Sequence, residues 1–87
     1  MPRQSLPRPT DVELEILNVL WNLGEASVRR IHDALKATRT TGYSTTLKMV
    51  QVMHEKGLVA RDESVRPQLY RAAASQEATQ LHMLDDL

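Results

Sequence analysis

One segment in the middle of the chain combines the signals of a helix start, a helix stop and a following strand. Residues 43–59 read YSTTLKMVQVMHEKGLV. Gly57 suits a left-handed helix stop, and the apolar pair after it is typical of a strand start. A helix that serves only for packing seldom begins Ser-Thr-Thr, whereas hydroxyls and free N-terminal amides together suit anionic oxygen. We therefore expect a helix over Ser44–Lys56 whose first turn can lie against phosphates and base edges.

Helical spacing divides this segment into two faces. The apolar residues Leu47, Val50, Met53 and in part Met49 share the side expected to face a core. The opposite side carries polar residues: Ser44, Thr45, Lys48, Gln51 and Glu55. We take Ser44, Thr45, Lys48 and Gln51 as candidate nucleic-acid contacts.

Two more helices are expected before this one. Thr10 and Glu13 have the spacing of a capping box, and Gly24 supplies a stop, which predicts a helix over Asp11–Leu23. Its inward residues are expected to be Val12, Ile16, Val19, Leu20 and Leu23. Ser27 is a second N-cap, and Val28, Ile31, Leu35 and in part Ala34 form an apolar stripe. They predict a helix over Val28–Ala37.

Three residues on these helices have more than one interpretation. Arg29 and Arg30 oppose the dipole at the start of their helix, so they fit either two solvated surface charges or a nearby phosphate. Trp21 ends the first helix, where packing against a core is the simpler role than a ligand platform.

The C-terminal third predicts a hairpin and one more helix. Residues 58–61 and 69–72 have strand composition, and the polar link between them places Arg66 at a hairpin tip. Ser75 can cap a terminal helix with Leu81, Leu84 and Leu87 on one side, a surface that requires a partner. The fold class is therefore mainly α with a small β-hairpin, a winged helix-turn-helix. We expect a flexible arm over 1–9, the winged helix over 10–73 and the start of a dimerisation helix over 74–87.

Composition narrows the class of protein. The chain has 87 residues, which fits one domain with a marginal core, so a second copy would stabilise it. It has no cysteine, and residues 1–9 hold no apolar run, so we expect a cytoplasmic protein without disulfides or membrane insertion. Net charge is zero, but residues 1–71 carry +3 and residues 72–87 carry −3. The basic part can still dock on a duplex.

The ordered set of motifs resembles the penicillinase-repressor family, the BlaI/MecI/CopY-type transcriptional regulators. The resemblance begins in residues 9–21, which end in Leu-Trp, and continues at Ser27-Val28 with Ile31. It is strongest in Tyr43-Ser44-Thr45 and in residues 55–59, and it closes with Tyr70-Arg71.

The resemblance implies a homodimeric repressor that binds a dyad operator through its winged helix and dimerises through C-terminal helices. It also implies a membrane sensor acting upstream in some members, and in others the release of DNA when copper binds to tail cysteines. Thiolate copper sensing is not expected without cysteine, and we expect no cofactor or metal. The family commonly has a polar residue where Leu47 stands and an arginine where Val52 stands, so neither is taken as a contact. The sequence also stops about where dimerisation helices should begin.

Two other classes of function compete with this interpretation. A winged helix that binds protein instead of DNA agrees with the neutral net charge and the missing arginine. An enzyme has little support, because His32, His54 and His82 form no metal-binding pair and no phosphate loop or nucleophile motif occurs.

Overall fold

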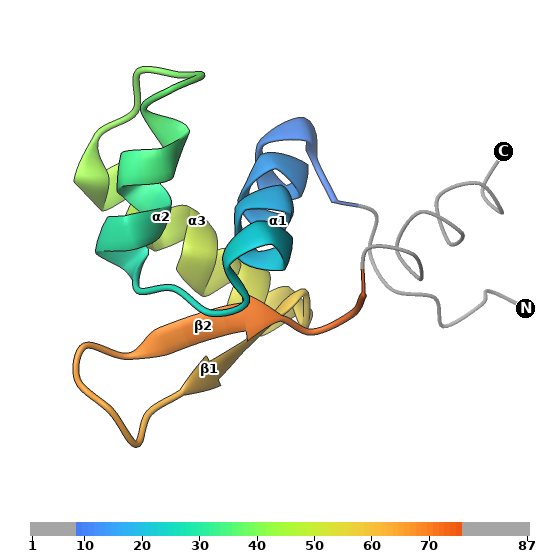
Figure 1. The fold of residues 1–87 in the computed structure, drawn as a ribbon. Coiled ribbons are helices and arrows are strands. Elements are labelled where there is room, and N and C mark those ends of the chain that lie inside the picture. The colour runs from blue at the N-terminus through green and yellow to red at the C-terminus, as the bar shows by residue number, and fades with distance from the viewer. Residues whose placement is uncertain (1–8, 76–87) are drawn as a thin grey trace, which may run out of the picture.

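The computed structural model describes residues 9–75, which form three helices and a two-stranded hairpin. In chain order these are α1 (Asp11–Leu23), α2 (Val28–Leu35), α3 (Tyr43–Lys56), β1 (Val59–Asp62) and β2 (Leu69–Ala72). The helices gather on one side of the antiparallel hairpin (Figure 1). This arrangement confirms the mainly α fold with a small hairpin and is consistent with a winged helix. The expected terminal helix, with Leu81, Leu84 and Leu87, lies outside the described residues.

The predicted helix caps are present. Thr10 and Glu13 form the reciprocal capping box: the Glu13 amide donates to Thr10 Oγ1 at 3.2 Å, and the Thr10 amide donates to Glu13 Oε1 at 3.0 Å. Ser27 Oγ accepts from the Arg30 amide at 3.2 Å. Gly57 ends α3 in the left-handed region, with φ of 84°, where a side chain would be strained. These local signals therefore set the helix ends.

Four element boundaries differ from the expected ones, and one of them is the end of the first strand, which lies at Asp62 instead of Arg61. α2 ends at Leu35 instead of Ala37, because the chain tightens there into a turn in which the Thr38 amide donates to the Leu35 carbonyl at 3.0 Å. α3 begins at Tyr43, since Gly42 takes the extended N-cap conformation. The first strand begins at Val59, because the Leu58 amide still donates to the Met53 carbonyl as part of the α3 cap.

The core lies between the three helices and the helix-facing side of the hairpin. Its apolar residues are Ile16, Leu17, Leu20, Ala26, Val28, Ile31, Leu35, Val50, Met53, Leu58, Val59 and Tyr70. The prediction that Leu23 and Ala34 face the core is wrong, because Leu23 is 40% exposed and Ala34 also faces solvent. Leu23 lies in the last turn of α1, beyond the elements that cover it. Leu17 is buried instead, because α1 contacts α2, α3 and β2 and so buries a wider arc than one stripe.

A single residue between α1 and α2 extends the sheet. Ala26 pairs with Tyr70 of β2: the Ala26 amide donates to the Tyr70 carbonyl at 3.0 Å, and the Tyr70 amide donates back at 2.8 Å. The two bonds tie the α1–α2 connection to the hairpin, whose register pairs Val59 with Ala72 and Asp62 with Leu69. The hairpin is therefore held in place relative to the helices.

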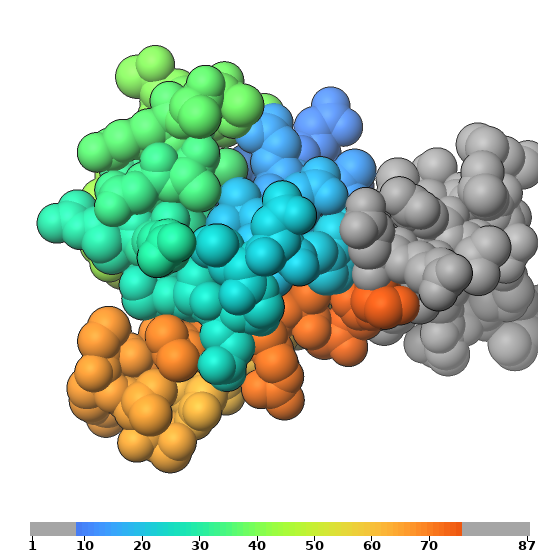
Figure 2. Space-filling view, viewed as in Figure 1, coloured from blue at the N-terminus to red at the C-terminus, as the bar shows by residue number. Residues whose placement is uncertain are grey.

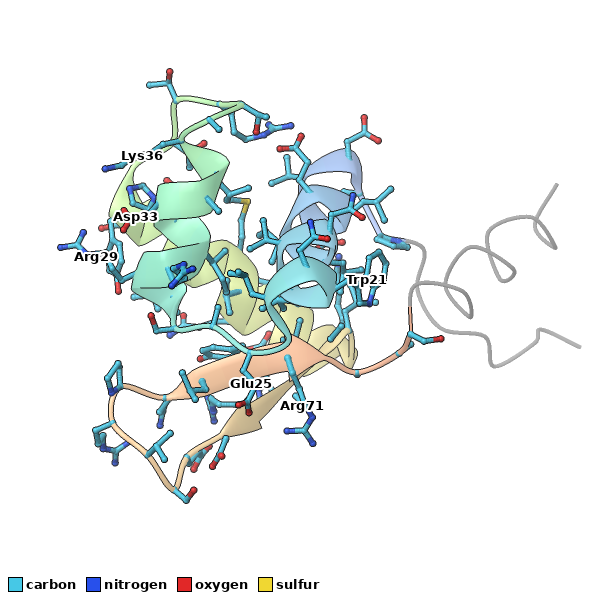
Figure 3. All side chains as sticks on the ribbon, in the orientation of Figure 1. Trp21, Glu25, Arg29, Asp33, Lys36 and Arg71 are labelled. Atoms are coloured by element: carbon cyan, nitrogen blue, oxygen red, sulfur yellow. The ribbon has the colours of Figure 1, made fainter. Side chains whose placement is uncertain are left out.

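Polar contacts attach α1 to distant parts of the chain. Lys56 Nζ lies 2.8 Å from Glu13 Oε2, and Arg39 Nε donates to Glu15 Oε1 at 3.1 Å. Trp21 is half-buried, and its Nε1 donates to the Ala74 carbonyl at 2.9 Å, on the side of α1 where the chain leaves β2 (Figure 3). These contacts give Trp21 a structural role. No helix within residues 9–75 is long and apolar enough to cross a membrane.

Candidate nucleic-acid interface

The outer face of α3 presents the four candidate contact residues expected there. Ser44, Thr45, Lys48 and Gln51 are all exposed. Gly42 provides no side-chain cap, so no side chain accepts from the amides of the first turn. That turn therefore offers hydroxyl and amide donors side by side at the positive end of the helix, an arrangement suited to anionic oxygen.

The third hydroxyl residue of the row, Thr46, has a different role. It is fully buried, and its Oγ1 lies 3.0 Å from Nδ1 of the buried His32 and 3.4 Å from the Gly42 carbonyl. If the hydroxyl donates to that carbonyl, it accepts from an Nδ1–H of the imidazole. The contact joins α2 to α3, so part of the hydroxyl signal in the sequence belongs to packing.

Arg29 is attached to the start of α3 through an aromatic contact. Its guanidinium carbon lies 5.4 Å from the centre of the Tyr43 ring, within cation–π range. The Tyr43 ring meets His32 edge to face at a centroid distance of 5.5 Å. Figure 3 shows Arg29 pointing outward from α2. Arg29 thus lies next to the first turn of α3 while its donors stay exposed.

A groove lies between α3, the start of α2 and the hairpin. It is lined by Ser27, Val28, Arg29, Tyr43, Leu47, Gln51, Arg61, Pro67, Gln68 and Tyr70. Its volume of about 240 Å³ is below the roughly 300–1,000 Å³ common for small-molecule sites. Figure 2 shows the hairpin loop standing out from the helices as a separate lobe.

The candidate residues divide between the groove and its surroundings. Arg29 and Gln51 line the groove. Ser44, Thr45 and Lys48 share the exposed face of α3, Arg30 lies beside Arg29 on α2, and Arg66 is exposed in the hairpin loop. Leu47, expected to face inward, is half-buried: it packs against the core and also lines the groove.

Arg61 is a groove residue that the sequence reasoning did not single out. It lies on β1 opposite Tyr70, and its Nε donates to Glu63 Oε2 at 2.8 Å. Hydrogen bonds with Tyr70 and Glu63 raise the pKa of Arg61 above its ordinary value. Strand alternation carries a signal for it, since Val59 two residues earlier is buried and alternate side chains share a face.

Of the two arginines that line the groove, Arg61 forms a salt bridge and Arg29 does not. In the part of the chain that the structure describes, carboxylates pair with Lys36, Arg39, Lys56 and Arg61. Five cations of residues 9–75 form no salt bridge: Arg29, Arg30, Lys48, Arg66 and Arg71. The first four lie on α2, α3 and the hairpin loop, so these elements carry exposed cations without a carboxylate partner although the net charge of the chain is zero. Among the described residues, no three His, Asp or Glu side chains gather as a metal site would require.

Comparison with known proteins shows the family of the chain. Residues 9–87 match the family model described as penicillinase repressor. The transcriptional regulator BlaI of Mycobacterium tuberculosis, in strains CDC 1551 and H37Rv, is 33% identical over 66 residues, which is 75% of this chain and 48% of the regulator. The chain thus spans about half the length of the curated relatives it matches. The resemblance seen in the sequence is confirmed, and the chain belongs to the penicillinase repressor family.

Proposed function

We propose that this chain carries the DNA-binding winged helix of a sequence-specific transcriptional repressor, with α3 in the major groove. The role is regulatory, not enzymatic. The observation that carries the proposal is the exposed polar face of α3 together with three arginines that form no salt bridge, Arg29 and Arg30 on α2 and Arg66 in the hairpin loop. Family membership supports the same role.

Each candidate residue has a contact suited to its chemistry. Ser44 and Thr45 in the first turn would reach phosphate or base edges, as recognition helices do with their N-terminal residues. Gln51 can bond an adenine with both its amide atoms, and Lys48 can read guanine or hold phosphate. Arg66 and the two arginines of α2 would position the protein on the backbone without reading sequence.

We also propose that the functional unit is a homodimer in the cytoplasm, formed through Leu81, Leu84 and Leu87. A two-fold dimer would present two α3 helices to a dyad operator about one DNA turn, roughly 34–36 Å, apart. Analytical ultracentrifugation of the chain and of a version ending at Ala74 tests this. We expect the longer chain alone to dimerise; two monomers that bind DNA alike would refute the assignment. An upstream membrane sensor belongs to the same proposal as the inducing input.

A mobility shift tests the repressor proposal directly. The chain is incubated with the DNA upstream of its own gene and with competitor DNA at two salt concentrations. We expect specific retention that Gln51→Ala weakens and that Asn22→Ala, which replaces an exposed amide on α1, leaves unchanged. If no duplex is retained specifically, the winged helix serves another purpose, and protein binding becomes the better interpretation.

A further inference from the structure

The groove between α3 and the hairpin has the lining of an anion site. Arg29 enters it from α2 and Arg61 from β1, while Gln51 and Gln68 supply amide groups. No aspartate or glutamate is among its lining residues. Its small volume suits a phosphate group better than an organic ligand. The groove also adjoins the face of α3 proposed to contact DNA, because Gln51 belongs to both.

Arg61 is held in a fixed place at this groove. It sits on β1 two residues after the buried Val59, and it lies directly opposite the buried Tyr70 in the hairpin register. Its side chain is 27% exposed, so the guanidinium is neither buried nor freely mobile in solvent. A planar guanidinium fixed in this way can bind two oxygens of one phosphate at once.

A carboxylate of the same hairpin occupies these donors. Glu63 Oε2 accepts from Arg61 Nε at 2.8 Å and also contacts Nη2. The Glu63 side chain is 57% exposed, and exposed ion pairs of this kind contribute only about 0–1 kcal/mol. Asp62 Oδ1 accepts from the amide and the hydroxyl of Ser64, which shapes the turn beside this pair.

We infer that the groove is a phosphate-binding subsite for the DNA backbone, and that Glu63 competes within the chain for the donors of Arg61. The inference rests on the proposed function and extends it to a residue of opposite charge. A backbone phosphate entering the groove replaces Glu63 on Arg61. Because phosphates carry no sequence information, this exchange affects every duplex alike.

The test measures binding of the 87-residue chain to a random-sequence duplex by fluorescence anisotropy at several salt concentrations. Glu63→Gln is expected to tighten binding two- to five-fold, the range that about 0.5–1 kcal/mol corresponds to. Arg61→Gln is expected to weaken binding and to reduce the salt slope by about 0.9, the value of one phosphate contact. The double variant should bind like Arg61→Gln alone.

Asp11→Asn is the matched control. It makes the same charge change on an exposed residue at the first position of the 13-residue helix α1. That position is about 20 Å from the helix end that joins the hairpin through Ala26. At 0.15 M salt, screening over about 8 Å removes most of its effect, so we expect a change of less than 1.5-fold. Thermal unfolding followed by circular dichroism checks that each variant folds.

Several outcomes would overturn the inference. If Asp11→Asn tightens binding as much as Glu63→Gln does, the effect is general repulsion. If Glu63→Gln still tightens binding when Arg61 is glutamine, Glu63 does not act through Arg61. Arg61→Lys keeps the positive charge but lacks the planar guanidinium that can bind two oxygens of one phosphate. It should therefore weaken binding and leave the salt slope unchanged. An undiminished affinity would refute two-oxygen recognition.

The design separates this inference from the proposed function. If the mobility shift shows no specific retention while the variants bind the random-sequence duplex as expected, the repressor proposal is refuted and the groove assignment stays in place. Absence of binding to any duplex would refute both.

Discussion

Glu13 joins two interactions that stabilise the fold, and its substitution gives a quantitative test of the structure. Its side chain is 8% exposed and accepts from the Thr10 amide at 3.0 Å and from Lys56 Nζ at 2.8 Å. Glu13→Ala removes both contacts, whereas Glu13→Gln can keep the bond to the Thr10 amide and loses the ion pair. The two variants therefore separate helix capping from the link between α1 and α3.

The magnitudes follow from the two contacts. Loss of an N-terminal capping interaction costs about 1 kcal/mol, and a hydrogen bond to a charged group contributes about 1.5–3 kcal/mol. Lys56 is 34% exposed, so solvent screening places its bond at the lower end of that range. We expect Glu13→Gln to lower the free energy of unfolding by about 1–2 kcal/mol and Glu13→Ala by about 2–3 kcal/mol.

The pH dependence gives an independent check. Burial raises the pKa of Glu13, but the hydrogen bonds from Lys56 and Thr10 and the charge of Lys56 outweigh it, so the pKa lies below its ordinary value of 4.5. A carboxylate with a lowered folded pKa stabilises the protein above its unfolded pKa, and this stabilisation is lost as the pH falls through the folded value. The difference between the native chain and Glu13→Gln should therefore be full at pH 7 and shrink below pH 4.5.

The assay is urea unfolding at neutral and acid pH, followed by circular dichroism. Exposed Glu55→Gln on α3 is the control, with an expected change within ±0.5 kcal/mol. If Glu13→Gln unfolds at the same urea concentration as the native chain at pH 7, the ion pair with Lys56 contributes nothing. If its deficit persists unchanged at pH 3, the loss does not arise from the ionised carboxylate.

Three further predictions concern the interface and its support. Gln51→Ala should cost about 1–3 kcal/mol on the specific site and relax one base position, as a binding-site selection would show; unchanged selectivity would remove Gln51 from the reading residues. Arg66→Ala should weaken specific and random duplexes equally and reduce the salt slope by about 1, and a loss confined to the specific site would mean that Arg66 reads bases. Thr46→Val should lower the free energy of unfolding by about 1–3 kcal/mol, because it leaves buried His32 without its partner, whereas exposed Thr45→Val should leave thermal unfolding nearly unchanged.

The candidate site was partly predictable because some of its signals are local. The exposed face of α3 follows from helical spacing, which assigned Ser44, Thr45, Lys48 and Gln51 to solvent. That spacing also puts Thr46 on the side of Val50 and Met53, but its hydrogen bond with His32, 14 residues earlier, is a tertiary contact that no local rule specifies. Arg61 was missed because its importance depends on the hairpin lying beside α3.

The sequence alone determined the features that depend on residues three or four positions apart. Thr10 with Glu13, Ser27 with the Arg30 amide, and Gly57 at the end of α3 set helix ends through contacts within one turn. Tertiary structure decided what each of these elements meets. Glu13 caps its own helix and also pairs with Lys56, 43 residues later, and Ala26 becomes a strand partner only because Tyr70 lies opposite it. Such contacts require the chain to be folded, because no local spacing specifies which distant residue will be adjacent. The groove lined by Arg29 and Arg61 therefore forms only when tertiary packing brings α2, α3 and the hairpin together, and the sequence alone does not show that these residues meet.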